Sequence, residues 1–304
     1  METVLISGGS GLIGSYLINK LKLKGYNVTL LSRKLIDKTD IKIFHWDPEK
    51  DKIDPGALTG ADYIINLSGA GIGESRWTKK RRRQIIDSRV RTTNLIFRNI
   101  KDNTNKLKAF ISASAIGYYG SVISDKIFTE TDPPSGDFLG ETCRQWEKSA
   151  DSFEELGIRT VKVRTGIVIT RKGGALSKMI IPVKAGIGSA AGRGNQYVPW
   201  IHIEDLCDIY VKAIEDKQLR GAYNAVAPEN TTNREFTRAL AKVLDKPFWF
   251  PAIPEIVMKM IFGKMSSILL YGSRVSSDKI RETGYNFHFP VLENALSDLL
   301  NNKS

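Results

Sequence analysis

The sequence predicts an α/β fold: a doubly wound, mostly parallel sheet followed by a smaller, mostly helical C-terminal lobe. Two observations predict it. Short apolar runs alternate with helical patterns through the first half of the chain, which is typical of βαβ units. After Arg164 the pattern becomes irregular and rich in glycine and proline, which suits loops above a cleft better than a sheet interior.

The first half contains the apolar runs expected of buried strands. These runs cover 3–7, 27–31, 41–45, 63–67, 108–113 and 160–164. Between the first two, Ile13, Leu17 and Leu21 recur every four residues and Gly25 ends the pattern, which predicts an amphipathic helix. A long helix is predicted over 79–100, between the fourth and fifth strands.

Two domains are expected. Residues 1–165 form the sheet domain, to which a later strand near 222–226 returns, and 166–304 form the C-terminal lobe. The last part of this lobe, about 248–297, is predicted to be a small helical module. A helix that ends at Leu244 has Asn233 as a plausible cap.

The apolar stretch 255–271 is interrupted by Lys259, Gly263 and Lys264 and is shorter than the roughly 20 residues that span a bilayer. We interpret it as helices with a methionine-rich core face and expect no membrane partner. The first residues show no secretion signal, and the two cysteines suggest no disulfide framework. We therefore expect a cytoplasmic protein, and the three separated histidines suggest no metal site.

The formal net charge of +12 is the most informative feature of the composition, because a basic surface attracts anions. Basic residues are densest over 79–83, "KKRRR". A solvated helix start explains this run, and a patch facing phosphate or nucleic acid is the alternative. No aromatic stacking motif accompanies it, so we do not expect a nucleic-acid partner.

Gly8, Gly11 and Gly14 lie at three-residue intervals between the first strand and the first helix. Glycines there permit a tight turn and close approach to a pyrophosphate, and the helix N-terminus offers free N–H groups. The pattern predicts a Rossmann-type dinucleotide site, against a purely structural turn. The intervening cofactor-binding candidates are Ser10, Leu12 and Ile13.

The end of the second strand indicates which dinucleotide binds. An NAD site usually has Asp or Glu there for the ribose 2′-hydroxyl, whereas a 2′-phosphate needs arginine or a hydroxyl. In this chain the strand ends in "LLSRK", which contains Ser32 and Arg33 and no carboxylate, and this favours NADP(H). The alternative is that Arg33 only faces solvent.

Two further segments are cofactor-binding candidates. Leu67, Ser68 and Gly69 follow the fourth strand, where small residues let the backbone pass close to the adenine and ribose. Arg89 falls inside the apolar stripe of the long helix, so it needs an anionic partner or must extend to solvent. Either the cofactor or a protein carboxylate could supply that partner.

Together these motifs resemble the extended short-chain dehydrogenase/reductase superfamily, and more closely its atypical "epimerase family" branch of nucleotide-sugar-epimerase-like proteins. The motifs include "GGSGLIG", "LSRK", "NLSGAGI", "SRVRTT", "SASAIGYYG", "VRTGIVI" and "PWIHIEDL", and the resemblance covers nearly the whole chain. It implies an NADP(H)-binding domain facing a C-terminal substrate lobe. Val168 of "VRTGIVI" is a further cofactor-binding candidate.

In the wider superfamily a Tyr-x-x-x-Lys pair exchanges the proton during hydride transfer and a serine orients the substrate. Ser114 matches the serine, but Phe138 and Thr142 stand where the pair should be. Tyr118 and Tyr119 are therefore the catalytic candidates that could replace the lost acid. The alternative is that one or both pack beneath the loop.

The resemblance implies an NADP(H)-dependent oxidoreductase or epimerase acting on an unknown small substrate, with sugar-related molecules among the candidates. The missing pair leaves a second hypothesis open, a non-catalytic NADP(H)-binding sensor or structural protein. His202 could contact substrate or join the two lobes, and Cys143 is expected to be a core residue rather than a nucleophile.

Overall fold

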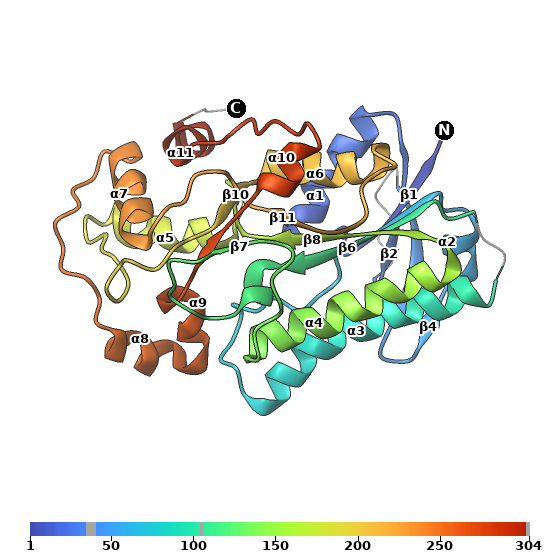
Figure 1. Ribbon diagram of the computed structural model, residues 1–304, viewed down its shortest axis with the longest axis horizontal. Coiled ribbons are helices and arrows are strands. Elements are labelled where there is room, and N and C mark those ends of the chain that lie inside the picture. The colour runs from blue at the N-terminus through green and yellow to red at the C-terminus, as the bar shows by residue number, and fades with distance from the viewer. Residues whose placement is uncertain (35–40, 104–105, 302–304) are drawn as a thin grey trace.

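The computed structural model describes residues 1–34, 41–103 and 106–301. Its centre is an eight-stranded sheet in the order β11-β8-β6-β5-β1-β2-β3-β4 (Figure 1). The strands are β1 Thr3–Ser7, β2 Asn27–Ser32, β3 Lys42–Asp47, β4 Lys52–Ile53, β5 Tyr63–Asn66, β6 Ala109–Ala115, β8 Arg159–Thr165 and β11 Gly221–Ala225. Every neighbouring pair is parallel except β3 and β4. The predicted doubly wound fold is confirmed.

Helices cover both faces of this sheet (Figure 1). They are α1 Leu12–Leu23 and α6 Ile203–Glu215 on one face, and α2 Pro55–Thr59, α3 Lys79–Lys101 and α4 Phe138–Asp151 on the other. Leu17 and Tyr210 are fully buried in the first layer, and Phe110 stacks on Phe153 at 3.8 Å in the second. The two apolar layers fix the sheet between them and leave the carboxyl ends of the strands open to ligands.

The C-terminal lobe is mostly helical, as predicted. Its elements are β9 Ile167–Ile169, α5 Gly174–Lys184, β10 Trp200–His202, α7 Asn233–Val243, α8 Glu255–Phe262, η3 Gly263–Ser266, α9 Ser267–Leu270, β12 Arg274–Val275, α10 Asp278–Glu282 and α11 Leu292–Asn301. β9 pairs with β10, and β12 pairs with β7 Ile127–Phe128 from the sheet domain. The strand expected near 222–226 is β11, which pairs with β8 at the sheet edge.

Two expectations for the lobe need correction. The cap of α7 is Thr232 rather than Asn233, because Thr232 is the extended residue and forms a reciprocal capping box with Glu235. The methionines of α8 do not form a core face: Met258 is buried, but Met260 is 66% exposed. α8 lies at the lower left end of the lobe in Figure 1, and Ile256 and Ile261 on it are also exposed.

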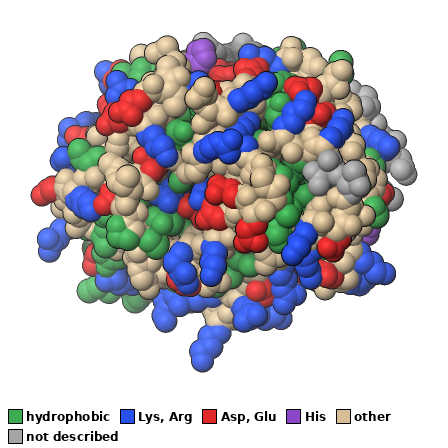
Figure 2. Space-filling view, turned by 45° about the vertical axis from the view of Figure 1, so that its right-hand side comes forward, with side chains coloured by type: hydrophobic (Ala, Val, Ile, Leu, Met, Phe, Trp, Pro, Cys, Tyr) green, Lys and Arg blue, Asp and Glu red, His purple; other side chains and the backbone are tan. Residues whose placement is uncertain are grey.

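Across the described residues, no helix is both long enough and apolar enough to cross a bilayer. The basic character of the chain is visible on the surface, where Lys and Arg side chains gather along the lower edge of Figure 2. The start of α3 lies at the same height, near the bottom of the molecule, in Figure 1. Thr78 caps that helix through a hydrogen bond from the Arg81 backbone N–H, and no acidic residue lies in its first turn.

Candidate functional site

The glycine turn connects β1 to α1 and packs against the end of β5. Gly8 has φ +76°, and a Cβ there would lie 2.9 Å from the carbonyl carbon and oxygen of Leu67. A Cβ at Gly14 would lie 2.6 Å from the Gly8 carbonyl oxygen. The turn is closed by a 3.0 Å hydrogen bond from the Gly11 N–H to the Gly8 carbonyl. Only glycine fits at both positions without moving the backbone.

The N-terminus of α1 fits a phosphate group. Its cap residue, Gly11, has no side chain to accept a hydrogen bond from the first-turn N–H groups. Ser10 and Gly11 are exposed, whereas Leu12 and Ile13 are half-buried. The helix therefore presents unsatisfied donors and a positive dipole end to solvent, with apolar packing behind them.

Asn66 stabilises the segment after β5, and the sequence reasoning missed it. Its side-chain oxygen accepts hydrogen bonds from the Ser7 hydroxyl at 2.5 Å and the Ser68 N–H at 3.2 Å. Its amide nitrogen donates to Thr93 on α3 at 2.9 Å. A fully buried asparagine at the end of an apolar strand was the available signal, because a buried amide must be hydrogen-bonded.

Ser32 and Arg33 lie at the carboxyl end of β2. The Ser32 hydroxyl donates to the Lys34 carbonyl at 2.8 Å, and Arg33 is exposed. Val168 is half-buried on β9 and packs against the core layer of α1. Ser32 and Arg33 thus follow the strand that pairs with β1, and Val168 contacts the layer that contains α1.

Arg89 has no carboxylate within ion-pair distance among the residues that the structure describes. Its Nη1 donates to the carbonyls of Ala70 at 3.1 Å and Ile85 at 2.9 Å. Its guanidinium lies 4.9 Å from the Trp146 ring, and burial lowers its pKa. A Cβ at Gly69 would lie 3.0 Å from the Arg89 Cζ, so Gly69 passes directly over the guanidinium.

Ser114 is the start of a buried polar network at the ends of β6 and β8. Its hydroxyl donates to Glu147 Oε1 at 2.6 Å, and Arg164 donates to both oxygens of Glu147 at 2.8 and 2.9 Å. All three side chains are less than 9% exposed. Burial alone would lower the pKa of Arg164, but the hydrogen bonds and charge of Glu147 outweigh it and raise that pKa.

Tyr118 and Tyr119 differ in their surroundings. Tyr119 is 3% exposed, and its hydroxyl donates to Asn224 at 2.7 Å and accepts from Arg164 at 3.0 Å. Burial raises its pKa to about 12. The Tyr118 ring is half-buried and stacks on the Arg164 guanidinium at 3.5 Å. Within the described chain, no group hydrogen-bonds the Tyr118 hydroxyl.

Phe138 and Thr142 lie in the first turns of α4. The ring centroids of Phe138 and Trp77 lie 4.9 Å apart, and the Arg82 Cζ lies 4.7 Å from the Phe138 centroid. The Thr142 hydroxyl donates to the Phe138 carbonyl at 2.6 Å. Neither side chain can exchange a proton with a ligand in the manner of a Tyr-Lys pair.

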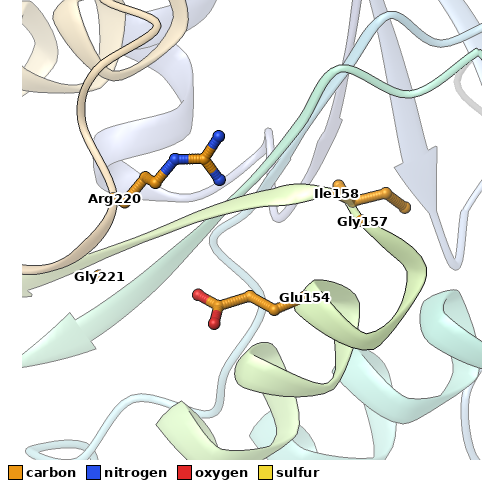
Figure 3. A pocket seen from close by; sticks show the side chains of 5 residues that line it. All are labelled: Glu154, Gly157, Ile158, Arg220 and Gly221. Carbon is orange, nitrogen blue, oxygen red and sulfur yellow. The ribbon is translucent and has the colours of Figure 1, made fainter.

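Two depressions lie on opposite sides of the sheet, one where strands begin and one at the carboxyl side of the strands. One of about 380 Å³ is lined by Glu154, Gly157, Ile158, Arg220 and Gly221, where β8 and β11 begin (Figure 3). The other, of about 630 Å³, lies between the start of α3, the start of α4 and the α8–η3 segment. Only the second is at the carboxyl side of the sheet, where open α/β folds bind ligands.

His202 and Cys143 are both buried. His202 is fully buried, stacks on Phe289 at 3.9 Å, and accepts a hydrogen bond from the Glu204 N–H at 3.2 Å. It joins β10 to α6 and the loop before α11. Burial raises the pKa of the Cys143 thiol to about 12, which does not suit a nucleophile at neutral pH.

The family model described as "NAD dependent epimerase/dehydratase family" matches residues 4–225. The chain belongs to the NAD-dependent epimerase/dehydratase family. A second model, a domain of unknown function (DUF1731), matches residues 253–299 in the helical lobe. The epimerase family protein YfhF of Bacillus subtilis (strain 168) is 34% identical over 305 residues, which covers 98% of this chain and 97% of that protein.

Several solved epimerases have the same fold. The human epimerase family protein SDR39U1 (isoform 2), solved with NADPH, has a TM-score of 0.89 and 33% identity, covering 99% of this chain and all of that one. A nucleoside-diphosphate sugar epimerase from Corynebacterium glutamicum has a TM-score of 0.80 and 30% identity, covering 98% of this chain and 58% of that one. A UDP-N-acetylglucosamine 4-epimerase from Bacillus cereus, at 14% identity, shares the fold.

Proposed function

We propose that the protein is an NADP(H)-dependent oxidoreductase or epimerase that acts on a small, sugar-related substrate in the cytoplasm. The observation that carries the proposal is the uncapped N-terminus of α1 together with Ser32 and Arg33 at the end of β2, where the described residues offer no carboxylate for a ribose 2′-hydroxyl. The NADPH in the solved human relative supports the choice of cofactor.

The residues present fit this cofactor. Gly8, Gly11 and Gly14 shape a turn that suits a pyrophosphate, and the exposed Arg33 after β2 is our candidate for holding a 2′-phosphate. Gly69 lets the cofactor pass close to the backbone after β5, above Arg89. When bound, the nicotinamide would supply hydride transfer with the substrate carbon.

Two side chains are our candidates for acting on the substrate. The proton of Ser114 is donated to Glu147, so the free lone pair of its oxygen accepts a hydrogen bond from a substrate hydroxyl and orients it. Tyr118 has the phenol that no described protein group engages, so it is our candidate for proton exchange. Tyr119 is the weaker candidate because its hydroxyl is already bonded to Arg164 and Asn224.

Fluorescence titration with NADPH and NADH tests the cofactor proposal. We expect NADPH to bind more tightly, and Arg33→Ala to weaken NADPH binding by about 10- to 100-fold, the loss typical of one charge-assisted hydrogen bond. NADH affinity should not change. Lys34→Ala is the matched control at the neighbouring exposed position. An NADH preference in the unaltered protein would overturn the proposal.

A second candidate function is a non-catalytic NADP(H) sensor or structural protein. Phe138 and Thr142 in place of the proton-transfer pair favour it. The two functions separate under single-turnover conditions with candidate sugar nucleotides. If the unaltered protein oxidises bound NADPH and Tyr118→Phe does not, the result supports the enzyme function. Tight NADPH binding without any hydride transfer supports the sensor function.

A further inference from the structure

We propose that the cleft between the two lobes binds an anionic group of the substrate, a phosphate or a carboxylate, together with an adjoining ring. This inference rests on the proposed function and names the substrate class. The cleft has a volume of about 630 Å³, and its cationic lining residues are Arg82, Lys259 and Lys264. Arg82 comes from α3, and the two lysines come from the α8–η3 segment, so both walls carry positive charge.

Arg82 is the principal anion contact because it is the one of these three cations that has a buried donor without a partner. Its Nε is buried and has no hydrogen-bond partner, and no carboxylate of the described residues lies within ion-pair distance. A buried guanidinium N–H without an acceptor is costly, so a ligand oxygen there would be stabilising. Lys259 has a partner, Glu255, at 3.1 Å, but both side chains are about half exposed.

Asp137 also lines the cleft, but its carboxylate does not pair with these cations. Asp137 caps α4: its Oδ1 accepts from the Gly140 N–H at 2.8 Å and its Oδ2 accepts from the Ser121 N–H at 2.8 Å. Both oxygens are thus used within the protein. None of the described residues supplies an acceptor for the Arg82 Nε, so we assign that role to a bound ligand.

Phe138 gives the cleft its second property, an aromatic wall. The Arg82 guanidinium lies 4.7 Å from the Phe138 ring and Trp77 contacts that ring from the side, with Tyr271 on the opposite wall. An aromatic face orients a guanidinium and leaves its N–H edge free. The residue that replaces the superfamily tyrosine therefore serves as a platform for an anion-binding arginine.

The two walls are joined next to the cleft. Arg76 donates to the carbonyls of Met260 at 2.9 Å and Ile261 at 2.7 Å, at the end of α8. The segment before α3 is thereby attached to the lobe that carries Lys259 and Lys264. The charges face one another across a volume suited to a small molecule.

The test uses full-length protein saturated with NADPH, so that phosphate-binding groups of the cofactor site are occupied. Phenyl phosphate, phenylacetate and the neutral benzyl alcohol are titrated by ligand-observed NMR. We expect the anions to bind and benzyl alcohol to bind at least about tenfold more weakly. Tighter binding of phenyl phosphate identifies a phosphate substrate, and tighter binding of phenylacetate a carboxylate.

Arg82→Ala should weaken binding of the preferred anion by about tenfold or more, and Arg82→Lys by less, because it keeps the charge but loses the planar fork. Arg83→Ala is the matched control: Arg83 is 75% exposed and pairs with Asp87 at 3.0 Å. Equal anion affinity in Arg82→Ala and the unaltered protein, or equal binding of benzyl alcohol, would overturn the inference.

NADPH titration of the same proteins separates the two proposals. If NADPH fails to bind while phenyl phosphate still binds through Arg82, the cofactor proposal fails and the anion cleft stands. If NADPH binds normally while Arg82→Ala leaves the anion affinity unchanged, only the proposal of the anion cleft is refuted.

Discussion

Ser114 donates its hydroxyl proton to Oε1 of Glu147 across 2.6 Å, and both side chains are buried between β6 and α4. Glu147 is held in turn by the two-pronged hydrogen bond from Arg164. The serine is therefore presented as a hydrogen-bond acceptor, with its rotamer set by a charge pair. A substrate hydroxyl suits this serine better than a substrate carbonyl oxygen does.

Removing the charge of Glu147 should destabilise the fold. We expect Glu147→Gln to lower the free energy of unfolding by about 3 to 5 kcal/mol, because the buried Arg164 loses its compensating charge. Denaturant unfolding followed by circular dichroism measures this loss. Glu141→Gln on the same helix is the control, since Glu141 pairs with Arg144 at the surface and should contribute less than about 1 kcal/mol. Equal losses in the two variants would contradict the role of the buried pair.

The two adjacent tyrosines should respond differently to loss of the hydroxyl. Tyr119→Phe removes one buried hydrogen bond from Asn224 and one from Arg164, which keeps its bonds to Glu147, so we expect a loss of about 1 to 3 kcal/mol in unfolding free energy. Tyr118→Phe keeps the ring stacked on Arg164 and should change stability by less than about 0.5 kcal/mol. If the protein turns over a substrate, Tyr118→Phe should abolish turnover while NADPH binding persists. A destabilised Tyr118→Phe protein would show that this hydroxyl is structural.

Local sequence patterns predicted the sheet because each buried strand is a short apolar run between turn residues. The strand expected over 160–164 is Arg159–Thr165, and the one over 108–113 is Ala109–Ala115. The two-residue strands β4, β7 and β12 were missed, because their pairing depends on which chain segments the fold brings together. The methionine face of α8 was misjudged for the same reason: amphipathicity does not say which side a neighbour covers.

The candidate site was only partly predictable. The glycine turn depends on residues within one strand-turn-helix unit, so spacing alone located it. The contact of Arg164 with Glu147 joins β8 to α4, 17 residues apart, and no spacing rule places those elements. An arginine inside the apolar run "TVKVRTG" was nevertheless a signal, because a buried guanidinium needs hydrogen-bond acceptors, of which a carboxylate is one kind.

His202 should make stability depend on pH. Burial lowers its pKa from 6.5 to about 4, against the opposing charges of Asp298 and Asp205. Between these values the unfolded chain binds a proton that the folded chain does not, so stability falls as pH drops from 6.5 towards 4. The shift corresponds to roughly 3 kcal/mol.

Replacing His202 with a side chain that does not titrate should remove this part of the pH dependence. His202→Asn keeps an acceptor for the Glu204 N–H. Between pH 7 and pH 4 its free energy of unfolding should fall by about 3 kcal/mol less than that of the unaltered protein. Urea unfolding at several pH values measures the difference. The same substitution at His288, which is 64% exposed, is the control. Parallel stability curves for His202→Asn and the unaltered protein would refute the assignment.

The glycine turn gives the sharpest test of where the cofactor binds. A Cβ at Gly14 would lie 2.6 Å from both the Gly8 carbonyl oxygen and the Gly9 Cα, and these are backbone atoms that cannot rotate away. Gly14→Ala must therefore displace the turn that presents the α1 donors. We expect NADPH affinity to fall by about tenfold or more, with about 1 to 3 kcal/mol lost from stability.

Gly60→Ala is the matched control for this variant. Gly60 ends α2 at φ −89°, and the nearest atom to an added Cβ is 3.8 Å away, so alanine fits without moving the backbone. NADPH fluorescence and circular dichroism, measured on both variants, separate lost binding from lost folding. If Gly14→Ala remains folded and binds NADPH as tightly as Gly60→Ala, the phosphates must bind elsewhere, because no displaced turn could keep the same N–H groups on the same pyrophosphate.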